Sequence, residues 1–187
     1  FPYCTHVSAE SKYSLALLRK WHGCDEILSQ NGSDDELSFD PSAFLLKNKA
    51  AIVLGTHIHK DLISSLAVFD FLLCSNPGMK LYVIGAEKSI PDSLRKRSDV
   101  VILGVKDRLF ISELLMSSYY YISTTRIENS FNAASEGVFL AEESYISKIP
   151  PHLELLNGFK YAEIKIKGCE EVILKISRGD VKSTNLK

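Results

Sequence analysis

Two glutamates separated by seven residues form the stretch of this sequence best suited to ligand chemistry. Glu128 and Glu136 bracket residues 129–135, which follow the apolar run 119–123 and lead into small residues typical of a helix. A polar turn between a strand and a helix N-terminus offers free backbone N–H groups, which bind anions. Each carboxylate can also accept two hydrogen bonds from vicinal hydroxyls. A diphosphate flanked by two diols, a ribose and a hexose, describes a nucleotide sugar.

Simpler roles exist for these residues. By themselves, the glutamates are better explained by a helix cap at Glu128 and a surface ion pair at Glu136. Lys60, near a helix start, either neutralises a phosphate or is a solvated surface lysine. His57 and His59 have His-x-His spacing, but no carboxylate or cysteine triplet accompanies them, so we expect no metal site.

Other common sites are disfavoured by what surrounds the first core strand. Gly55 is the single glycine of its loop, so neither a Gly-x-Gly-x-x-Gly dinucleotide turn nor a Walker lysine loop is present. His152 follows two prolines, and we interpret it as a residue of a helix start and not as a catalyst. These patterns argue against hydride transfer and P-loop chemistry.

The elements that must position these residues alternate along the chain. Apolar runs predict strands at 49–55, 80–85, 99–104, 119–123, 144–147 and 161–166. Helical patterns separate them, and we also expect helices over 8–20 and 169–177. Continuous apolar strands alternating with helices indicate an α/β, Rossmann-like three-layer sandwich with a mostly parallel, doubly wound sheet. Ligands bind at the carboxyl edge of such sheets, which here carries Gly55, Gly85, Gly104 and the Glu128 turn.

Composition limits the class of protein. The chain has 187 residues, 45% hydrophobic and 24% charged, with a net charge of −1, which favours neither nucleic acid nor an anionic membrane surface. Four scattered cysteines indicate a reducing compartment, and no apolar run approaches the roughly 20 residues of a membrane span. We expect one domain, with residues 1–48 as a lead-in and 49–187 as its core. Because the chain begins at Phe1, we expect a fragment of a longer protein.

With these residues in view, the chain resembles the C-terminal, donor-binding half of a family 4 ("group 1") retaining glycosyltransferase of the GT-B fold. Within that family, the sequence is similar to bacterial enzymes of O-antigen and capsule polysaccharide synthesis. The ordered set of motifs carries it, more than any one motif alone. In chain order these are Asn31-Gly32, Gly55 to Lys60, Val83-Ile84-Gly85, Val101 to Val105, Glu128 to Glu136, and Ile146 to Leu156.

The resemblance implies roles for single residues. Glu136 would bind the ribose hydroxyls, Glu128 the transferred sugar, and Lys60 the diphosphate, whose departure Lys60 would stabilise together with the helix N-terminus. Glu128 and Lys60 are thus the expected catalytic residues. The expected substrate-binding set is Gly55, Thr56, Lys60, Gly85, Val105, Glu128, Asn129, Ser130, Phe131, Asn132 and Glu136.

The resemblance also implies the reaction and its setting. A UDP- or GDP-sugar would donate its sugar with retention of anomeric configuration, without a metal or cofactor, to a polysaccharide or lipid-linked acceptor. A cytoplasmic enzyme associated with the inner membrane face is expected. The N-terminal acceptor domain of the family is missing from this sequence, so the isolated chain is expected to be inactive.

Departures from the family pattern leave alternatives open. Thr56 and His57 occupy the place of the family's phosphate-binding arginine, for which a protonated His57 or His59 would be a weak substitute. Asn132 replaces a common glycine. A non-catalytic Rossmann-like module that binds a nucleotide or a partner is therefore the second hypothesis. A nucleotide-sugar epimerase of related fold is the third.

Overall fold

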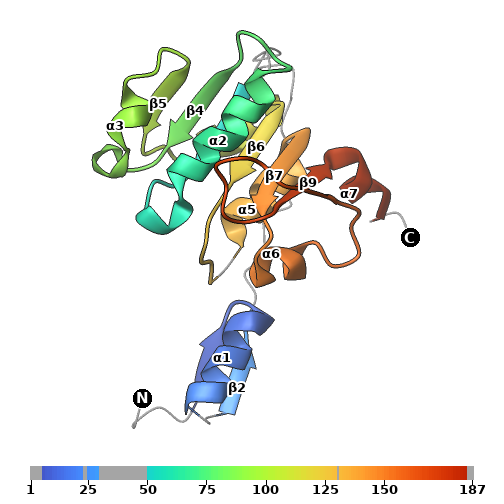
Figure 1. Ribbon diagram of the computed structural model, residues 1–187. Helices are drawn as coiled ribbons and strands as arrows, with labels where there is room; N and C mark the ends of the chain where they lie inside the picture. Colours follow the sequence, from blue (N-terminus) through green and yellow to red (C-terminus); the bar gives the residue numbers. More distant parts are fainter. Residues whose placement is uncertain (1–5, 23–24, 30–49, 130, 185–187) are drawn as a thin grey trace.

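A seven-stranded sheet flanked by helices forms the core of the protein (Figure 1). The computed structural model describes residues 6–22, 25–29, 50–129 and 131–184. The strand order is β5-β4-β3-β6-β7-β9-β8, in which the first five strands are parallel and β9 is antiparallel to both β7 and β8. The strands are β3 (Ala50–Leu54), β4 (Lys80–Ile84), β5 (Val100–Gly104), β6 (Tyr120–Ser123), β7 (Glu143–Ser147), β8 (Ala162–Ile164) and β9 (Ile173–Ser177).

Helices cover both faces of this sheet. One face packs against α2 (Leu62–Leu73) and the short α3 (Asp92–Arg95), with Phe69 and Leu94 fully buried. The other face packs against α4, α5 and α7, and also receives the short α6. The bounds are α4 (Arg108–Ser117), α5 (Asn132–Leu140), α6 (Pro150–Leu155) and α7 (Arg178–Thr184), with 3-10 turns η1 (Ile58–Lys60) and η2 (Glu87–Ser89). The predicted doubly wound three-layer sandwich is confirmed.

The order of the strands creates a crevice at a fixed place. The chain runs outward from β3 through β4 to β5, then returns to the other side of β3 with β6 and β7. The loops after β3 and β6 therefore leave the sheet toward opposite faces, and the gap between them is where such folds bind ligands. Aspartates start two of the helices: Asp61 accepts the N–H of Ser64, and Asp107 accepts the N–H of Phe110.

Helix α5 lies unusually close to the sheet. Tyr121 of β6 is completely buried, and its ring fills the space where Gly137 of α5 lacks a side chain. A Cβ atom built on Gly137 would be 2.1 Å from the Tyr121 ring, which no real contact allows. Gly137 therefore fixes how near the helix, and the Glu128–Glu136 stretch before it, comes to β6.

The last predicted element is wrong. Residues 169–177, expected as a helix, contain the strand β9, and the helix α7 begins only at Arg178. β9 is buried between β7 and β8, with Ile173, Leu174 and Ile176 almost without exposure. A short apolar run has no periodicity that separates a buried strand from a buried helix. Pairing with β7 and β8 makes this segment a strand.

Residues before the core form a unit of their own. β1 (His6–Ala9), α1 (Lys12–His22) and β2 (Asp25–Leu28) make a separate two-stranded parallel sheet with one helix, below the core in Figure 1. The helix expected over 8–20 thus begins at Lys12, where Ser11 Oγ accepts the N–H of Ser14 at 3.1 Å. The Asn31-Gly32 motif lies outside the described residues.

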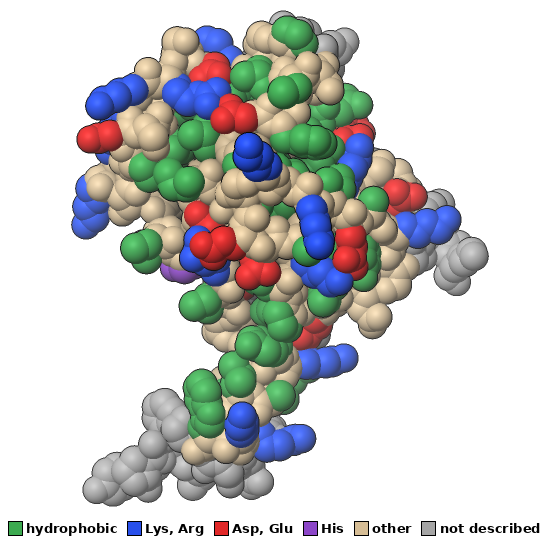
Figure 2. Space-filling view, in the orientation of Figure 1, with side chains coloured by type: hydrophobic (Ala, Val, Ile, Leu, Met, Phe, Trp, Pro, Cys, Tyr) green, Lys and Arg blue, Asp and Glu red, His purple; other side chains and the backbone are tan. Residues whose placement is uncertain are grey.

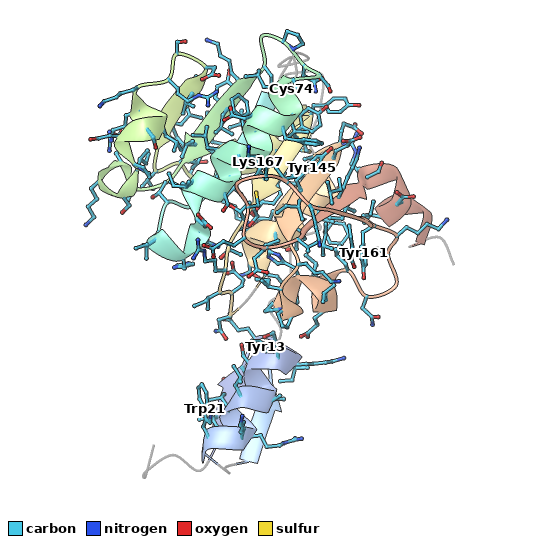
Figure 3. The ribbon with its side chains drawn as sticks, in the orientation of Figure 1. Tyr13, Trp21, Cys74, Tyr145, Tyr161 and Lys167 are labelled. Carbon is cyan, nitrogen blue, oxygen red and sulfur yellow. The ribbon has the colours of Figure 1, made fainter. Side chains whose placement is uncertain are left out.

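This N-terminal unit contacts the core through polar groups. The Lys12 N–H donates to both carboxylate oxygens of Glu154, at 3.1 and 2.9 Å. Hydrophobic side chains gather on its surface (Figure 2), and Tyr13 and Trp21 extend from α1 (Figure 3). Trp21 is 67% exposed, although tryptophan is a residue that folded domains usually bury.

Candidate functional site

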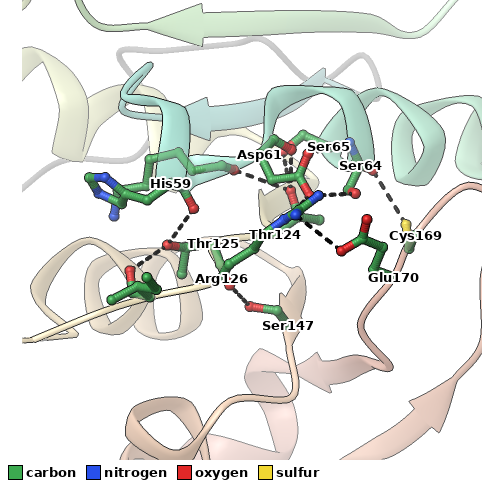
Figure 4. A network of polar contacts seen from close by, with 12 residues as sticks. His59, Asp61, Ser64, Ser65, Thr124, Thr125, Arg126, Ser147, Cys169 and Glu170 are labelled. Atoms are coloured by element: carbon green, nitrogen blue, oxygen red, sulfur yellow. Dashed lines mark hydrogen bonds and ion pairs between the residues drawn. The ribbon is translucent and has the colours of Figure 1, made fainter.

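The loops that follow β3 and β6 are joined across the crevice by backbone and hydroxyl groups (Figure 4). The Arg126 N–H donates to the His59 carbonyl at 2.9 Å, and Thr125 Oγ1 donates to the same oxygen at 3.1 Å. Thr124 Oγ1 donates to the Asp61 carbonyl at 2.8 Å. The third strand end joins them, because Ser147 Oγ donates to the Thr125 carbonyl at 2.5 Å. The three loops therefore form one connected floor.

The two expected catalytic residues meet on this floor. Lys60 Nζ lies 2.7 Å from Glu128 Oε2, and the two side chains are only 13% and 17% exposed. Gly55, in the left-handed region at φ 86°, lies against the aliphatic part of Lys60, since a Cβ there would be 3.3 Å from Lys60 Cε. A larger residue at position 55 would push the lysine away from its partner.

Thr56 and Gly85 form the neighbouring junction between the ends of β3 and β4. Thr56 Oγ1 donates to the Ala86 carbonyl at 2.8 Å. Gly85 has φ 146°, and a Cβ on it would lie 2.7 Å from Thr56 Cγ2. Both predicted binding residues are therefore part of a tight contact between two strand ends. This contact leaves no room for a side chain at position 85.

Helix α5 begins next to the same floor without a side-chain cap. It starts at Asn132, and the preceding Phe131 makes no capping hydrogen bond. The N–H groups of its first turn lack the partners that a cap supplies, so they are suited to an anion. Asn129 is exposed and its amide donates to Glu10 of the N-terminal unit at 3.5 Å, while Ser130 lies outside the described residues.

Glu136 lies one helical turn further along, half-buried. Burial raises the pKa of its carboxyl group, and the positive charge of Arg108 acts in the opposite direction. Arg108 Nε is 3.5 Å from Glu136 Oε1. Each glutamate of the motif therefore faces a cation. Val105 is 77% exposed past the end of β5, two strands away from β3.

An open cavity of about 880 Å³ lies on the α2 side of the crevice. Among the predicted binding residues that the structure describes, Thr56 alone lines it. Its wall includes His57 and His59, whose rings stack 5.6 Å apart, and burial together with the charge of Lys60 lowers the pKa of His59. A neutral His59 at neutral pH does not replace an arginine as a phosphate-binding cation. Arg126, which also lines the cavity, is bound to Asp61 and Glu170 at 2.9 and 3.0 Å.

Three residues near this site were missed from the sequence. Arg108 is the first residue of α4, the helix after β5, and this position was the only sequence signal for a role at the site. Tyr121 looked like any other residue of a buried strand. His152 was assigned to a helix start, which is correct, since α6 begins with Pro150 and Pro151, but its ring is completely buried beside Ser147.

Comparisons with known proteins support the fold. No protein-family model matches the chain, and no curated protein matches its sequence. Among solved structures, Anabaena HepE in complex with UDP and glucose is similar with a TM-score of 0.63 and 17% identity, over 82% of this chain and 47% of that one. Sucrose-phosphate synthase from Thermosynechococcus elongatus gives a TM-score of 0.58 and 19% identity, over 80% and 42%.

WaaG, a glycosyltransferase involved in lipopolysaccharide biosynthesis, gives a TM-score of 0.53 and 15% identity, over 70% of this chain and 41% of its own. The chain spans less than half of the length of each of these three proteins. The core therefore has the fold of a Rossmann-like domain of the GT-B glycosyltransferases. Within the described residues, no helix is long and apolar enough to cross a membrane.

Proposed function

We propose that residues 50–184 are the donor-binding domain of a GT-B glycosyltransferase that transfers a hexose-type sugar from a nucleotide sugar. The observation that carries the proposal is the 2.7 Å contact between Lys60 and Glu128 at the point where the strand order reverses. A cation, a carboxylate and an uncapped helix N-terminus at one crevice are the groups that a diphosphate and a sugar need.

In this proposal each group has a separate task. Lys60 and the first N–H groups of α5 hold the diphosphate and stabilise the charge that develops as it leaves. Glu128 accepts hydrogen bonds from the hydroxyls of the transferred sugar. Glu136 accepts those of the ribose, and its raised pKa reflects a carboxylate that is short of water and open to such donors. Lys60 and Glu128 must separate before either can do its task.

The finer details of the proposal rest on the family resemblance. They are retention of configuration, independence of metals, a UDP- or GDP-sugar donor, and a polysaccharide or lipid-linked acceptor at the cytoplasmic face of the inner membrane. The structure of HepE with UDP and glucose supports a nucleotide sugar as the ligand of this fold. WaaG supports an acceptor in bacterial surface polysaccharide.

The proposal includes a second domain that supplies the acceptor. Parallel sheets are normally covered on both faces, and an isolated two-stranded sheet is marginally stable. We therefore infer that β1 and β2 are two strands of a second parallel sheet, which the acceptor domain completes. Trp21 is the single tryptophan of the chain, so iodide quenching of its fluorescence reports on this contact. Quenching should be strong in residues 1–187 alone and weak in a chain that carries the acceptor domain.

Calorimetry with UDP, GDP, UDP-glucose and GDP-mannose tests the donor site directly. We expect saturable binding of one nucleotide series and a loss of about tenfold or more in affinity for Glu136→Ala, because a carboxylate that accepts two hydroxyls is removed. Glu163→Ala is the matched control. Glu163 lies on β8, at the far edge of the sheet, and forms an exposed ion pair with Lys148. The absence of saturable binding to any of the four ligands would overturn the proposal.

A second function has one observation in its favour. Thr56 and His57 stand where the family pattern has a phosphate-binding arginine, and the neighbouring His59 has a lowered pKa, so the site has less positive charge than the family pattern implies. A module that binds a nucleotide without transferring a sugar fits this reduced charge. It predicts nucleotide binding to this chain but no transfer and no hydrolysis of the sugar by a chain that also carries the acceptor domain.

A further inference from the structure

Two buried polar atoms near the site have no hydrogen-bond partner among the described residues. They are Tyr121 Oη and His152 Nε2, and both residues are completely buried. A buried polar group without a partner costs folding free energy, so such atoms are rare and call for an explanation. They belong to different elements, β6 and the first turn of α6, yet each residue is under the charge of one member of the Lys60–Glu128 pair.

Tyr121 is the group on the carboxylate side. Its side chain points to the same face of β6 as Ser123, which is one pleat closer to the carboxyl edge, and Gly137 holds the ring under α5. Burial raises the pKa of its phenol, the nearby Ser123 hydroxyl acts in the opposite direction, and the negative charges of Glu128 and Glu136 raise the pKa further. The hydroxyl therefore keeps its proton, and it is a donor without an acceptor among the described residues, in the electrostatic field of Glu128.

His152 is the group on the cation side. Its Nδ1 is 2.7 Å from the Ser147 carbonyl, which can only accept, so Nδ1 carries the proton and Nε2 has a free lone pair. Burial lowers the pKa of the ring to about 4, and the charge of Lys60 acts in the same direction. His152 Nε2 is therefore an acceptor without a donor among the described residues. Ser147 and Thr125 link its ring to the His59 carbonyl, one residue before Lys60.

These two atoms are complementary to the two charges that act on them. In the empty site the ion pair satisfies both charges, and Tyr121 and His152 remain unused. A bound diphosphate attracts Lys60 and leaves Glu128 as a buried carboxylate without a cation, which is costly. A donor and an acceptor already in place offset that cost without any rearrangement of the fold.

We propose that the Lys60–Glu128 pair has a second, ligand-bound arrangement for which Tyr121 and His152 are the positioning residues. In it, Tyr121 Oη donates to the Glu128 carboxylate and thereby replaces the ammonium group. His152 Nε2 accepts one N–H of Lys60 while the diphosphate accepts another. This inference rests on the proposed function. It names the groups that offset the free-energy cost of separating Lys60 from Glu128 when the donor binds.

Tyr121→Phe tests the carboxylate side, because it removes one oxygen and no other atom. The ligands are whichever of UDP and GDP binds the wild-type chain more tightly, and the matching nucleoside without phosphates. We expect the dissociation constant of the diphosphate to rise about tenfold, since a hydrogen bond to a charged group is lost. The nucleoside constant should be unchanged, because a nucleoside does not draw Lys60 away. The urea midpoint should not fall, since the hydroxyl has no partner in the empty fold.

Tyr145→Phe is the matched control. Tyr145 is also buried, but its hydroxyl donates to Glu143 Oε2 at 3.0 Å on the opposite face of the sheet. Its loss should lower the urea midpoint and leave both dissociation constants unchanged. The two tyrosines should therefore give opposite results in the two measurements.

His152→Asn tests the cation side, because an asparagine amide can keep the hydrogen bond to Ser147 but lacks an acceptor at the Nε2 position. We expect it, too, to weaken the diphosphate and spare the nucleoside. The inference is overturned if the wild-type chain binds the diphosphate and both variants bind it within about twofold of wild type, or if Tyr121→Phe is destabilised as Tyr145→Phe is. If the wild-type chain binds neither UDP nor GDP, the proposed function fails and this inference falls with it.

Discussion

Two ion pairs join the same two loops of this protein, side by side and with opposite polarity. Asp61–Arg126 is embedded in other contacts: Asp61 also accepts from the N–H and the hydroxyl of Ser64, at 3.3 and 2.8 Å, and Arg126 reaches Glu170 as well. Lys60–Glu128 has one contact at 2.7 Å, while Tyr121 Oη and His152 Nε2 have no partner among the described residues. The first pair is built to hold the loops together. The second is built to be exchanged for a ligand.

The largest effect is expected from neutralising the exchangeable pair. Lys60→Met with Glu128→Gln keeps the side-chain volumes, and we expect the free energy of unfolding to stay within about 1 kcal/mol of wild type, because a nearly buried pair costs desolvation. The affinity for the nucleoside diphosphate should fall on the order of 100-fold, as two charged contacts to the ligand are lost. Urea titration and calorimetry measure the two quantities. A destabilisation of several kcal/mol would show that this pair, too, is structural.

Asp61→Ala should have the converse result. Asp61 caps α2 from a left-handed conformation (φ 46°) and accepts three hydrogen bonds, so its loss should lower the free energy of unfolding by about 2–3 kcal/mol. Asp92→Ala is the control, since Asp92 is exposed in the first turn of α3 without acting as its cap. Equal urea midpoints for the two variants would contradict a clamp at Asp61.

The next largest effect is expected in the dependence of stability on pH, through the buried His152. The folded pKa of His152, about 4, lies below the value of about 6.5 in the unfolded chain. The unfolded chain thus takes up a proton first as the pH falls. This contribution to stability is nearly complete above pH ~6.5 and should decrease by about 2 kcal/mol between pH ~6.5 and ~4.5. The wild-type chain should show this loss relative to His152→Asn in urea titrations at both pH values. Parallel pH profiles would mean that the histidine is not held neutral by burial.

The smallest effect is expected from Arg126→Gln. The arginine side chain is 47% exposed, so salt and water screen its pair with Asp61. We expect a smaller decrease in thermal stability than for Asp61→Ala, and a decrease that disappears in ~1 M NaCl. A loss as large as that of Asp61→Ala would mean that the ion pair, and not the helix cap, carries the clamp.

Much of the fold could be read from the sequence, because its signals are local. The strands β3, β4 and β5 are largely apolar runs that end at or next to a glycine, and α2, α4 and α6 start at an aspartate or a proline. β9 was misread because the difference between a buried strand and a buried helix lay in its neighbours. For the same reason the strand β1 was not predicted before α1.

The site divides in the same way. Lys60 and Glu128 could be chosen from spacing and resemblance, but nothing local indicates that residues 68 positions apart pair with each other. Tyr121 and His152 gave no signal, because what distinguishes them is the absence of a partner in three dimensions. Val105 was placed in the predicted binding set, and whether it contacts a ligand stays a prediction. The predicted roles of these residues stay predictions, which the binding experiments test.

The position of β9 has a consequence for how the chain is made. β9 inserts between β7 and β8, so β8 is synthesised first but has no neighbour to pair with until β9 arrives. Until Ile173 to Ser177 leave the ribosome, β7 presents an open row of backbone groups, which is a template for aggregation. A nascent chain that stalls before Ile173 is therefore the form of this protein most in need of a chaperone.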